Sequence, residues 1–391
     1  MHACNRARWS VASLHGVVGL TLALGLMLGV AGTAGAGAQP IRIGLQGPIT
    51  GAWALEGEMA VNSVQIVADQ INARGGVLGR PVEIVIGDDQ GSPRQAALVA
   101  QRMVAQGVVA VISSYGSSIT EPASVIYEEA GLLNIAYGAT AVSLTERGYR
   151  YFFRTCFRDD RQGDFFAEMV RTHLRASRIA IVHDNTTFAR GLAEAARSSL
   201  AGVPGVEIVF YDAITPGERD FTATISRMRT RNPEVVYFTA YYPEAGLFLR
   251  QMREAGLDAV FVGGNAAVNA EFIDIAGRGV AAGVLVTQEP LPTDLPYPQA
   301  QAFLAEYVAR HGAPPSSPWP VYAADALNVI VAAIEVTGST DSAVLADYLR
   351  HQLRIDGITG PIAFDERGDR EGAIYKAYVV NEEGAIVDAG Y

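Results

Sequence analysis

Hydroxyl-bearing residues follow a short apolar run in the first third of the chain. Val109–Ile112 is predicted to be a strand, and Ser117 and Ser118 come shortly after it, directly behind Gly116. Open α/β sheets bind their ligands at the carboxyl ends of parallel strands. A glycine lets the backbone approach a ligand, and the free N–H groups of a following helix favour a carboxylate. This turn therefore predicts a site for an organic acid.

A second turn of the same kind follows the next predicted strand, Leu133–Ala136. It contains Gly138 and Ala139 and ends in the hydroxyl of Thr140. Two such turns on successive strands could hold the two oxygens of one carboxylate.

Ordinary helix capping is the alternative explanation for the first turn. Ser118 and Glu121 have the spacing of a capping box. The two roles are compatible, because Ser118 can cap the helix while Ser117 faces the ligand.

Evidence for catalysis is thin. The sequence contains no G-x-S-x-G, no H-E-x-x-H and no P-loop. His183 and Asp184 could form half of a catalytic pair in a hydrolase, but a hydrogen-bonded strand end is the simpler interpretation without a nucleophile beside them. Cys156 is the one cysteine beyond the first few residues, which excludes an intramolecular disulfide and a cysteine-rich metal site. We expect a binding protein that is not an enzyme, with no cofactor and no metal.

The elements that must position these residues alternate along the chain. From Ile41 onward, short β-rich runs alternate with segments of helical periodicity, which predicts βα units around parallel sheets. The pattern starts again near Arg161, so we expect two similar lobes. The Pro-rich stretches 290–298 and 314–320 are predicted loops. The predicted strands are 41–45, 82–86, 109–112, 133–136, 179–183, 206–211, 235–239, 260–263 and 373–380.

The amino terminus has the pattern of a cleavable signal peptide. Arg6 and Arg8 precede the apolar run Val17–Val30, and the small residues Ala36-Gly37-Ala38 fit a cleavage site. The run is shorter than the roughly 20 residues that a membrane-spanning helix needs. We expect no later segment to be apolar for long enough to span a membrane, so we predict a soluble protein of the periplasm.

Composition sets limits on the partners. The 391 residues include 30 Lys and Arg against 41 Asp and Glu, for a formal net charge of −11. Nucleic-acid binding needs clustered basic residues, so we expect no nucleic-acid partner. Hydrophobic residues make up 49% of the chain, which is enough for two packed cores.

The sequence resembles the leucine/isoleucine/valine-binding proteins, the periplasmic receptors of hydrophobic amino acid ABC transporters. The resemblance covers nearly the whole chain after the leader. Its markers are Gly47-Pro48-Ile49-Thr50-Gly51, Asp69 with Ile71-Asn72-Ala73-Arg74-Gly75-Gly76, Glu121-Pro122-Ala123-Ser124, Gly138-Ala139-Thr140, Leu144-Thr145, Arg154-Thr155, Tyr241-Tyr242-Pro243-Glu244 and Gly360-Pro361 through Asp365.

The resemblance implies an α/β fold of two Rossmann-like lobes with parallel sheets, joined by a three-strand hinge and closing on a ligand. The crossings would fall near Arg158, Gln288 and Gly372. The implied division is a signal peptide at 1–38, lobe 1 at 39–158 plus 289–372, and lobe 2 at 159–288 plus 373–391.

The resemblance also implies a binding site. Ser117 and Thr140 would bind the ligand carboxylate, and the Gly138 carbonyl would accept from an ammonium. Tyr241 would close over the ligand from the opposing lobe, and Phe188 stands where relatives have a tyrosine. An aromatic lining of Tyr115, Tyr137, Phe188, Tyr241 and Tyr242 is expected, about half of it touching the ligand. The predicted ligand-binding residues are Ser117, Thr140, Gly138, Ala139, Tyr115, Gly116, Phe188, Tyr241 and Asn265.

Two departures from the family pattern bear on the ligand. Asn265 stands where amino acid receptors place a glutamate against the ligand's ammonium, and a neutral amide offsets a buried cation only weakly. Either another acid, Glu56 or Glu289, replaces it, or the ligand is an amine-free, possibly aromatic carboxylate. The family's disulfide is absent, since its two positions are Gly91 and Gly116.

The expected function is that of an extracytoplasmic solute-binding receptor of an ABC importer, which binds a branched-chain or other hydrophobic amino acid or a related carboxylate. Its expected partners are that ligand and an inner-membrane permease, and we expect a monomer. A ligand sensor on the same fold is one alternative, and a hydrolase is another.

Overall fold

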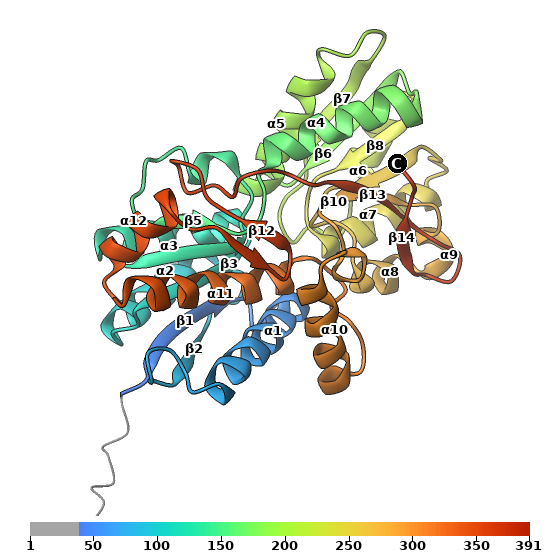
Figure 1. Ribbon diagram of the computed structural model, residues 1–391. Coiled ribbons are helices and arrows are strands. Elements are labelled where there is room, and N and C mark those ends of the chain that lie inside the picture. The colour runs from blue at the N-terminus through green and yellow to red at the C-terminus, as the bar shows by residue number, and fades with distance from the viewer. Residues whose placement is uncertain (1–38) are drawn as a thin grey trace, which may run out of the picture. The chain divides into compact units, whose positions relative to one another are not determined.

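The computed structural model describes residues 39–391, which build two α/β lobes, each around its own sheet (Figure 1). The predicted signal peptide, residues 1–38, lies outside the described residues. The two-lobed α/β architecture agrees with the prediction. A small hairpin of β11 (Ile355–Gly357) and β12 (Gly360–Ile362) completes the strands.

The first sheet has five parallel strands in the order β2-β1-β3-β4-β5. Val111 packs under α2 and α3, whereas Ile112 belongs to the core beneath α1 and α11. Helices on both faces bury β3 and β4 along their whole length, as is usual for parallel strands. The elements of this lobe are β1 (Ile41–Gly47), α1 (Ala54–Ala73), β2 (Val82–Asp88), α2 (Pro93–Ala105), β3 (Ala110–Tyr115), α3 (Ser117–Glu129), β4 (Leu133–Gly138), β5 (Phe152–Arg154), α10 (Pro298–His311), α11 (Trp319–Thr337) and α12 (Ser342–His351).

The second sheet has seven strands in the order β14-β13-β10-β9-β8-β6-β7. The strands from β7 to β10 are parallel, but β13 and β14 run antiparallel, so this sheet is mixed where a parallel sheet was predicted. A strand that returns by a short hairpin must be antiparallel to its neighbour, which accounts for β14. The elements are α4 (Asp159–Met169), β6 (Arg178–His183), α5 (Thr187–Leu200), β7 (Glu207–Ala213), α6 (Thr222–Arg229), β8 (Val235–Phe238), α7 (Tyr242–Glu254), β9 (Val260–Gly263), α8 (Ala270–Ala276), α9 (Arg278–Ala281), β10 (Leu285–Gln288), β13 (Lys376–Val380) and β14 (Ile386–Asp388).

The prediction that no later segment is apolar for long enough to span a membrane was wrong. Within residues 39–391, α11 is long and apolar enough to cross a bilayer by length and composition. It is instead the central helix of the first lobe, packed on α1 and β4 and mostly buried. The apolar faces that a membrane would cover are therefore covered here by protein.

The chain crosses between the sheets three times, and a buried ion pair joins the first and third crossings. Arg154 Nε lies 2.5 Å from Asp369 Oδ1, and Arg158 Nη1 lies 2.9 Å from Asp369 Oδ2. Burial acts to raise the pKa of Asp369, but the two arginines hold it below its ordinary value. Arg154 also donates to the carbonyls of Ala139 and Ala141, both at 2.9 Å. This pair therefore fixes the turn after β4 as well as the hinge.

We predict that Asp369→Ala lowers the free energy of unfolding by about 3–5 kcal/mol, because it leaves the Arg154 guanidinium buried without its counter-charge. Urea unfolding provides the measurement. The control is Arg367→Ala, whose pair with Glu146 is more than half exposed on both sides and whose loss should cost less than about 1 kcal/mol. Equal effects of the two substitutions would contradict a special role for the buried pair.

Candidate ligand-binding site

The two hydroxyl-bearing turns predicted from the sequence lie against each other. Tyr115 and Gly138 are register partners at the ends of β3 and β4. The Gly116 N–H donates to the Gly138 carbonyl at 3.0 Å, and the Ala141 N–H donates to Ser117 Oγ at 3.1 Å. The hydroxyl of Ser117 still has its proton to donate. Both turns therefore present polar groups at one edge of the first sheet.

Gly116 determines the shape of the first turn. It is the N-cap residue of α3 and has φ of +94°, a conformation that residues with a side chain rarely adopt. The predicted cap, Ser118, was wrong, because no side chain caps this helix. Ser118 Oγ instead accepts the backbone N–H of Thr187 at 2.8 Å, and Thr187 Oγ1 donates to Glu121 at 2.9 Å. Since Thr187 begins α5 in the second lobe, Ser118 and Glu121 both make a contact between the lobes.

Two backbone carbonyls of the second turn already accept hydrogen bonds from residues of the hinge. The Ala139 carbonyl accepts from Arg154, and the Thr140 carbonyl accepts the N–H of Asp159 at 3.1 Å. Gly138 has little room for a side chain, since a Cβ there would lie 3.1 Å from the Tyr115 ring. The Thr140 side chain and the second lone pair of the Gly138 carbonyl are the groups of this turn with capacity for a ligand.

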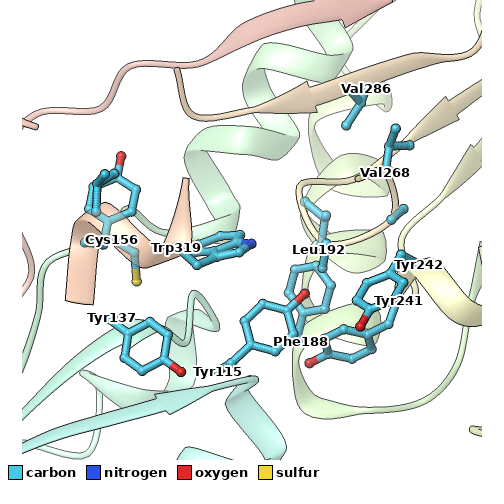
Figure 2. Packing of buried hydrophobic residues seen from close by; sticks show 14 of the residues in the cluster. Tyr115, Tyr137, Cys156, Phe188, Leu192, Tyr241, Tyr242, Val268, Val286 and Trp319 are labelled. Carbon is cyan, nitrogen blue, oxygen red and sulfur yellow. The ribbon is translucent and has the colours of Figure 1, made fainter. Parts of the chain in front are cut away.

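Aromatic rings from both lobes gather beside these turns (Figure 2). The Tyr115 ring meets Tyr241 at 5.8 Å and Trp319 at 5.9 Å between centroids, both edge-on. Phe188 lies 5.3 Å from Tyr241 within the second lobe. Tyr241, at the start of α7, therefore joins the predicted aromatic residues of one lobe to those of the other.

The other two aromatic residues of the predicted lining have different surroundings. The Tyr242 hydroxyl donates to the Ala52 carbonyl at 2.9 Å and so ties the start of α7 to the first lobe. Tyr137 is buried in the first lobe, and its hydroxyl comes within 2.9 Å of where a Cβ at Gly47 would lie.

Asn265 and Glu289 form a buried polar pair in this region. Asn265 Nδ2 donates to Glu289 Oε2 at 3.2 Å. The second oxygen of Glu289 and the amide oxygen of Asn265 have no hydrogen-bond partner among residues 39–391. Burial raises the pKa of Glu289 to about 7, although nearby backbone N–H groups and Asn265 act to lower it. A buried carboxylate with a free oxygen is a strong acceptor for a cationic donor.

Asp159 adds a second buried carboxylate close to Glu289. Burial raises its pKa to about 7, the Thr140 hydroxyl and Arg154 act to lower it, and the charge of Glu289 acts to raise it. The carboxylate lies beside Gly191 of α5, where a Cβ would be in ordinary contact with Oδ2 at 3.6 Å. Within the described chain, neither Asp159 nor Glu289 has a basic side chain at salt-bridge distance. The charge of Glu289 thus acts on Asp159, and within the described residues neither acid forms an ion pair.

Glu56, the other acid considered from the sequence, has partners within the protein. Its Oε2 accepts from Ser317 at 2.6 Å and its Oε1 accepts from Asn269 at 3.0 Å. Burial raises the pKa of Glu56 to about 7 against the lowering effect of these two donors. Because each of its oxygens already has a donor, Glu56 is less suited than Glu289 to a ligand's ammonium.

The residues considered for catalysis have structural partners. His183 Nδ1 accepts the N–H of Asn185 at 3.1 Å, and Asp184 Oδ1 accepts both the N–H and the hydroxyl of Thr186. Cys156 is fully buried, which raises the pKa of its thiol to about 12. A search of residues 39–391 finds no group of His, Cys, Asp or Glu that could hold a metal ion.

Comparison with known proteins identifies the architecture. A family profile described as a periplasmic binding protein matches residues 40–384. The chain belongs to this family. Periplasmic binding proteins of this kind are solute-binding receptors, and the family resemblance and two-lobed fold predicted from the sequence are confirmed.

The relatives cover almost the whole receptor. The Leu/Ile/Val-binding protein homolog 1 of Brucella abortus is 34% identical over 338 residues, which is 86% of this chain and 90% of the relative. A leucine-binding protein of Thermotoga maritima has a TM-score of 0.82 at 27% identity, covering 89% of this chain and 99% of that structure. A branched-chain amino acid transporter substrate-binding protein of Streptococcus pneumoniae, solved in complex with isoleucine, has a TM-score of 0.80 at 28% identity and covers 89% and 98%.

Three residues beside the candidate site escaped the sequence analysis. Asp159 resembles any acidic first residue of a helix, and its burial arises only where the two lobes meet. Trp319 is the first residue of α11, which comes from a distant part of the chain. Trp53 stands just before α1, at the same sheet edge as the two turns, and that position was a usable signal.

We predict that the ligand-free protein loses stability as the pH rises from about 5 to about 8. Between the ordinary carboxyl value and the raised one, the folded state holds a proton on Glu289 that the unfolded state has released, so stability falls with rising pH. Glu289→Gln should flatten this slope in urea unfolding measured at several pH values. The exposed Glu382→Gln is the control, and an unchanged slope in Glu289→Gln would contradict the assignment.

Proposed function

We propose that the protein is an extracytoplasmic receptor that traps a hydrophobic amino acid between its two lobes for an ABC importer. One observation carries the proposal. The two adjoining turns that contain Ser117 and Thr140 present hydroxyl groups, and the buried Glu289 carboxylate has an oxygen without a hydrogen-bond partner in residues 39–391. The turns suit an α-carboxylate, and Glu289 with Asp159 suits an α-ammonium. The two kinds of group are thus available for the two ends of a zwitterion.

The same contacts favour an amino acid over an amine-free acid. A second anion placed beside Asp159 and Glu289 would add like-charge repulsion, whereas an ammonium would neutralise them. Asn265 then acts by holding Glu289 in place through its amide N–H groups. In this account Glu289 takes the role that the resemblance assigns to a glutamate at position 265.

Two features support a branched-chain or otherwise hydrophobic side chain. The surroundings of the turns are aromatic: Tyr115 contacts Trp319 and Tyr241, and Tyr241 also contacts Phe188. The relatives are named as Leu/Ile/Val-binding and leucine-binding proteins, and one neighbouring structure holds isoleucine. Apolar lining with a few convergent polar groups is the usual form of such a site.

Closure of the lobes would couple binding to transport. Polar groups of the first lobe and acids at the hinge would contact the ligand together only in the closed form. The ligand would therefore bind the closed form more tightly than the open form and so favour closure. We propose that an inner-membrane permease recognises this closed form. The signal-peptide pattern and the family support a periplasmic location. We propose that the receptor is a monomer and that it releases its ligand unchanged.

The ammonium assignment predicts that the protein binds leucine much more tightly than 4-methylpentanoate, which has the same skeleton without the amine. Glu289→Gln should weaken leucine binding by about 2–3 kcal/mol, because it removes a charged acceptor, and should leave 4-methylpentanoate less affected. Isothermal calorimetry measures both.

Glu56→Gln is the matched control, since Glu56 is an equally buried carboxylate whose oxygens are both partnered. It should leave the difference between the two ligands unchanged. Tighter binding of 4-methylpentanoate by the wild-type protein would show instead that the ligand is an amine-free carboxylate.

A second prediction concerns the carboxylate end. Ser117→Ala and Thr140→Ala should each weaken binding of leucine by a few kcal/mol at most, as expected for one lost hydrogen bond to a charged group, about 1.5–3 kcal/mol. Ser199→Ala is the control, because Ser199 lies at the far end of α5 and its hydroxyl donates to Asp164 of α4. Unchanged affinity in both Ser117→Ala and Thr140→Ala would remove these residues from the site.

A further inference from the structure

Trp53 makes an aromatic contact across the two lobes. It is the residue before α1 in the first lobe, and its ring stacks on Tyr241 of the second lobe with centroids 4.2 Å apart and planes at 30°. The same indole meets Tyr115 edge-on at 5.6 Å. Trp53 therefore touches the two tyrosines that the sequence placed on opposite sides of the ligand.

Two glycines provide the space for this indole. A Cβ at Gly91 would lie 2.8 Å from Cε3 of Trp53, and a Cβ at Gly116 would lie 3.3 Å from Cζ3 and 3.1 Å from the Tyr241 hydroxyl. Both glycines have positive φ, +63° and +94°. The indole thus lies across the backbone of the carboxylate-binding turn, and a methyl group at Gly91 would push it away.

A neighbouring contact holds this segment from the second lobe. The Tyr242 hydroxyl donates to the carbonyl of Ala52, the residue directly before Trp53. Tyr241 and Tyr242 are consecutive, so the start of α7 contacts the Trp53 segment through a ring stack and a hydrogen bond together. Both contacts join the first lobe to the second.

We propose that Trp53 is a ligand-retaining residue whose indole covers the amino acid site and slows release from the closed receptor. This inference rests on the proposed function. Stacked aromatic pairs stabilise a contact beyond the area they bury, and interface contacts act mainly on the dissociation rate. Trp53 is thereby assigned a role in binding that adds to those of the two turns and the buried acids.

The test is release of radiolabelled leucine into excess unlabelled leucine. Trp53→Ala should release leucine about tenfold faster than the wild type, and Trp53→Phe should lie between them. Tyr151→Ala is the control, because Tyr151 lies at the start of β5, at the opposite edge of the first sheet, and should not change release. Thermal melting confirms that each variant is folded.

Gly91→Ala tests the geometry without removing the indole. It should speed release in the wild-type background and have no further effect in Trp53→Ala. Release from Trp53→Ala within about twofold of the wild type would overturn the proposal while leaving the proposed function intact, since the wild type would still bind.

A measurement on the wild type tests the proposed function separately from this proposal. Small-angle X-ray scattering of the leucine-bound wild type should give a smaller radius of gyration than that of the ligand-free protein, because the proposed function requires closure. Failure of the wild type to bind any hydrophobic amino acid would reject the proposed function.

Discussion

A buried carboxylate must hold a proton or meet a cation, and two such carboxylates lie where the two lobes join. Glu289 and Asp159 lie there with raised pKa values and without a basic side chain at salt-bridge distance in residues 39–391. Asp369, by contrast, is a buried carboxylate that forms an ion pair with Arg154. The unbalanced acids are therefore a cost to the ligand-free state that a bound ammonium would relieve.

The rest of the structure can be understood as holding donors and acids at one place. Arg154 links the hinge to the Ala139 and Ala141 carbonyls, so the ion pair that joins two crossings also shapes the second turn. The Thr140 carbonyl accepts the N–H of Asp159, which joins that turn to α4. The hinge, the two hydroxyl-bearing turns and the acidic pair are thus one connected network. Movement of the lobes would act on all of it.

The sequence was most informative where local pattern determines structure. The alternation of strands and helices predicted both lobes, and glycine followed by hydroxyl residues predicted two turns that the structure brings into contact. The antiparallel direction of β13 escaped prediction, because strand direction depends on which sheet a distant segment joins. Local spacing misassigned Ser118, whose partner Thr187 lies 69 residues away in the other lobe. The burial of Asp159 and the stack of Trp53 on Tyr241 likewise depend on lobe contacts that no short motif encodes.

The most direct test of the central claim is the number of protons exchanged on binding, measured by calorimetry at pH 7 in buffers of different ionisation enthalpy. An ammonium beside Glu289 and Asp159 would lower their pKa values, so leucine binding should release protons to the buffer. Binding of 4-methylpentanoate should release none. Leucine binding with no proton release, or with proton uptake, would contradict the account.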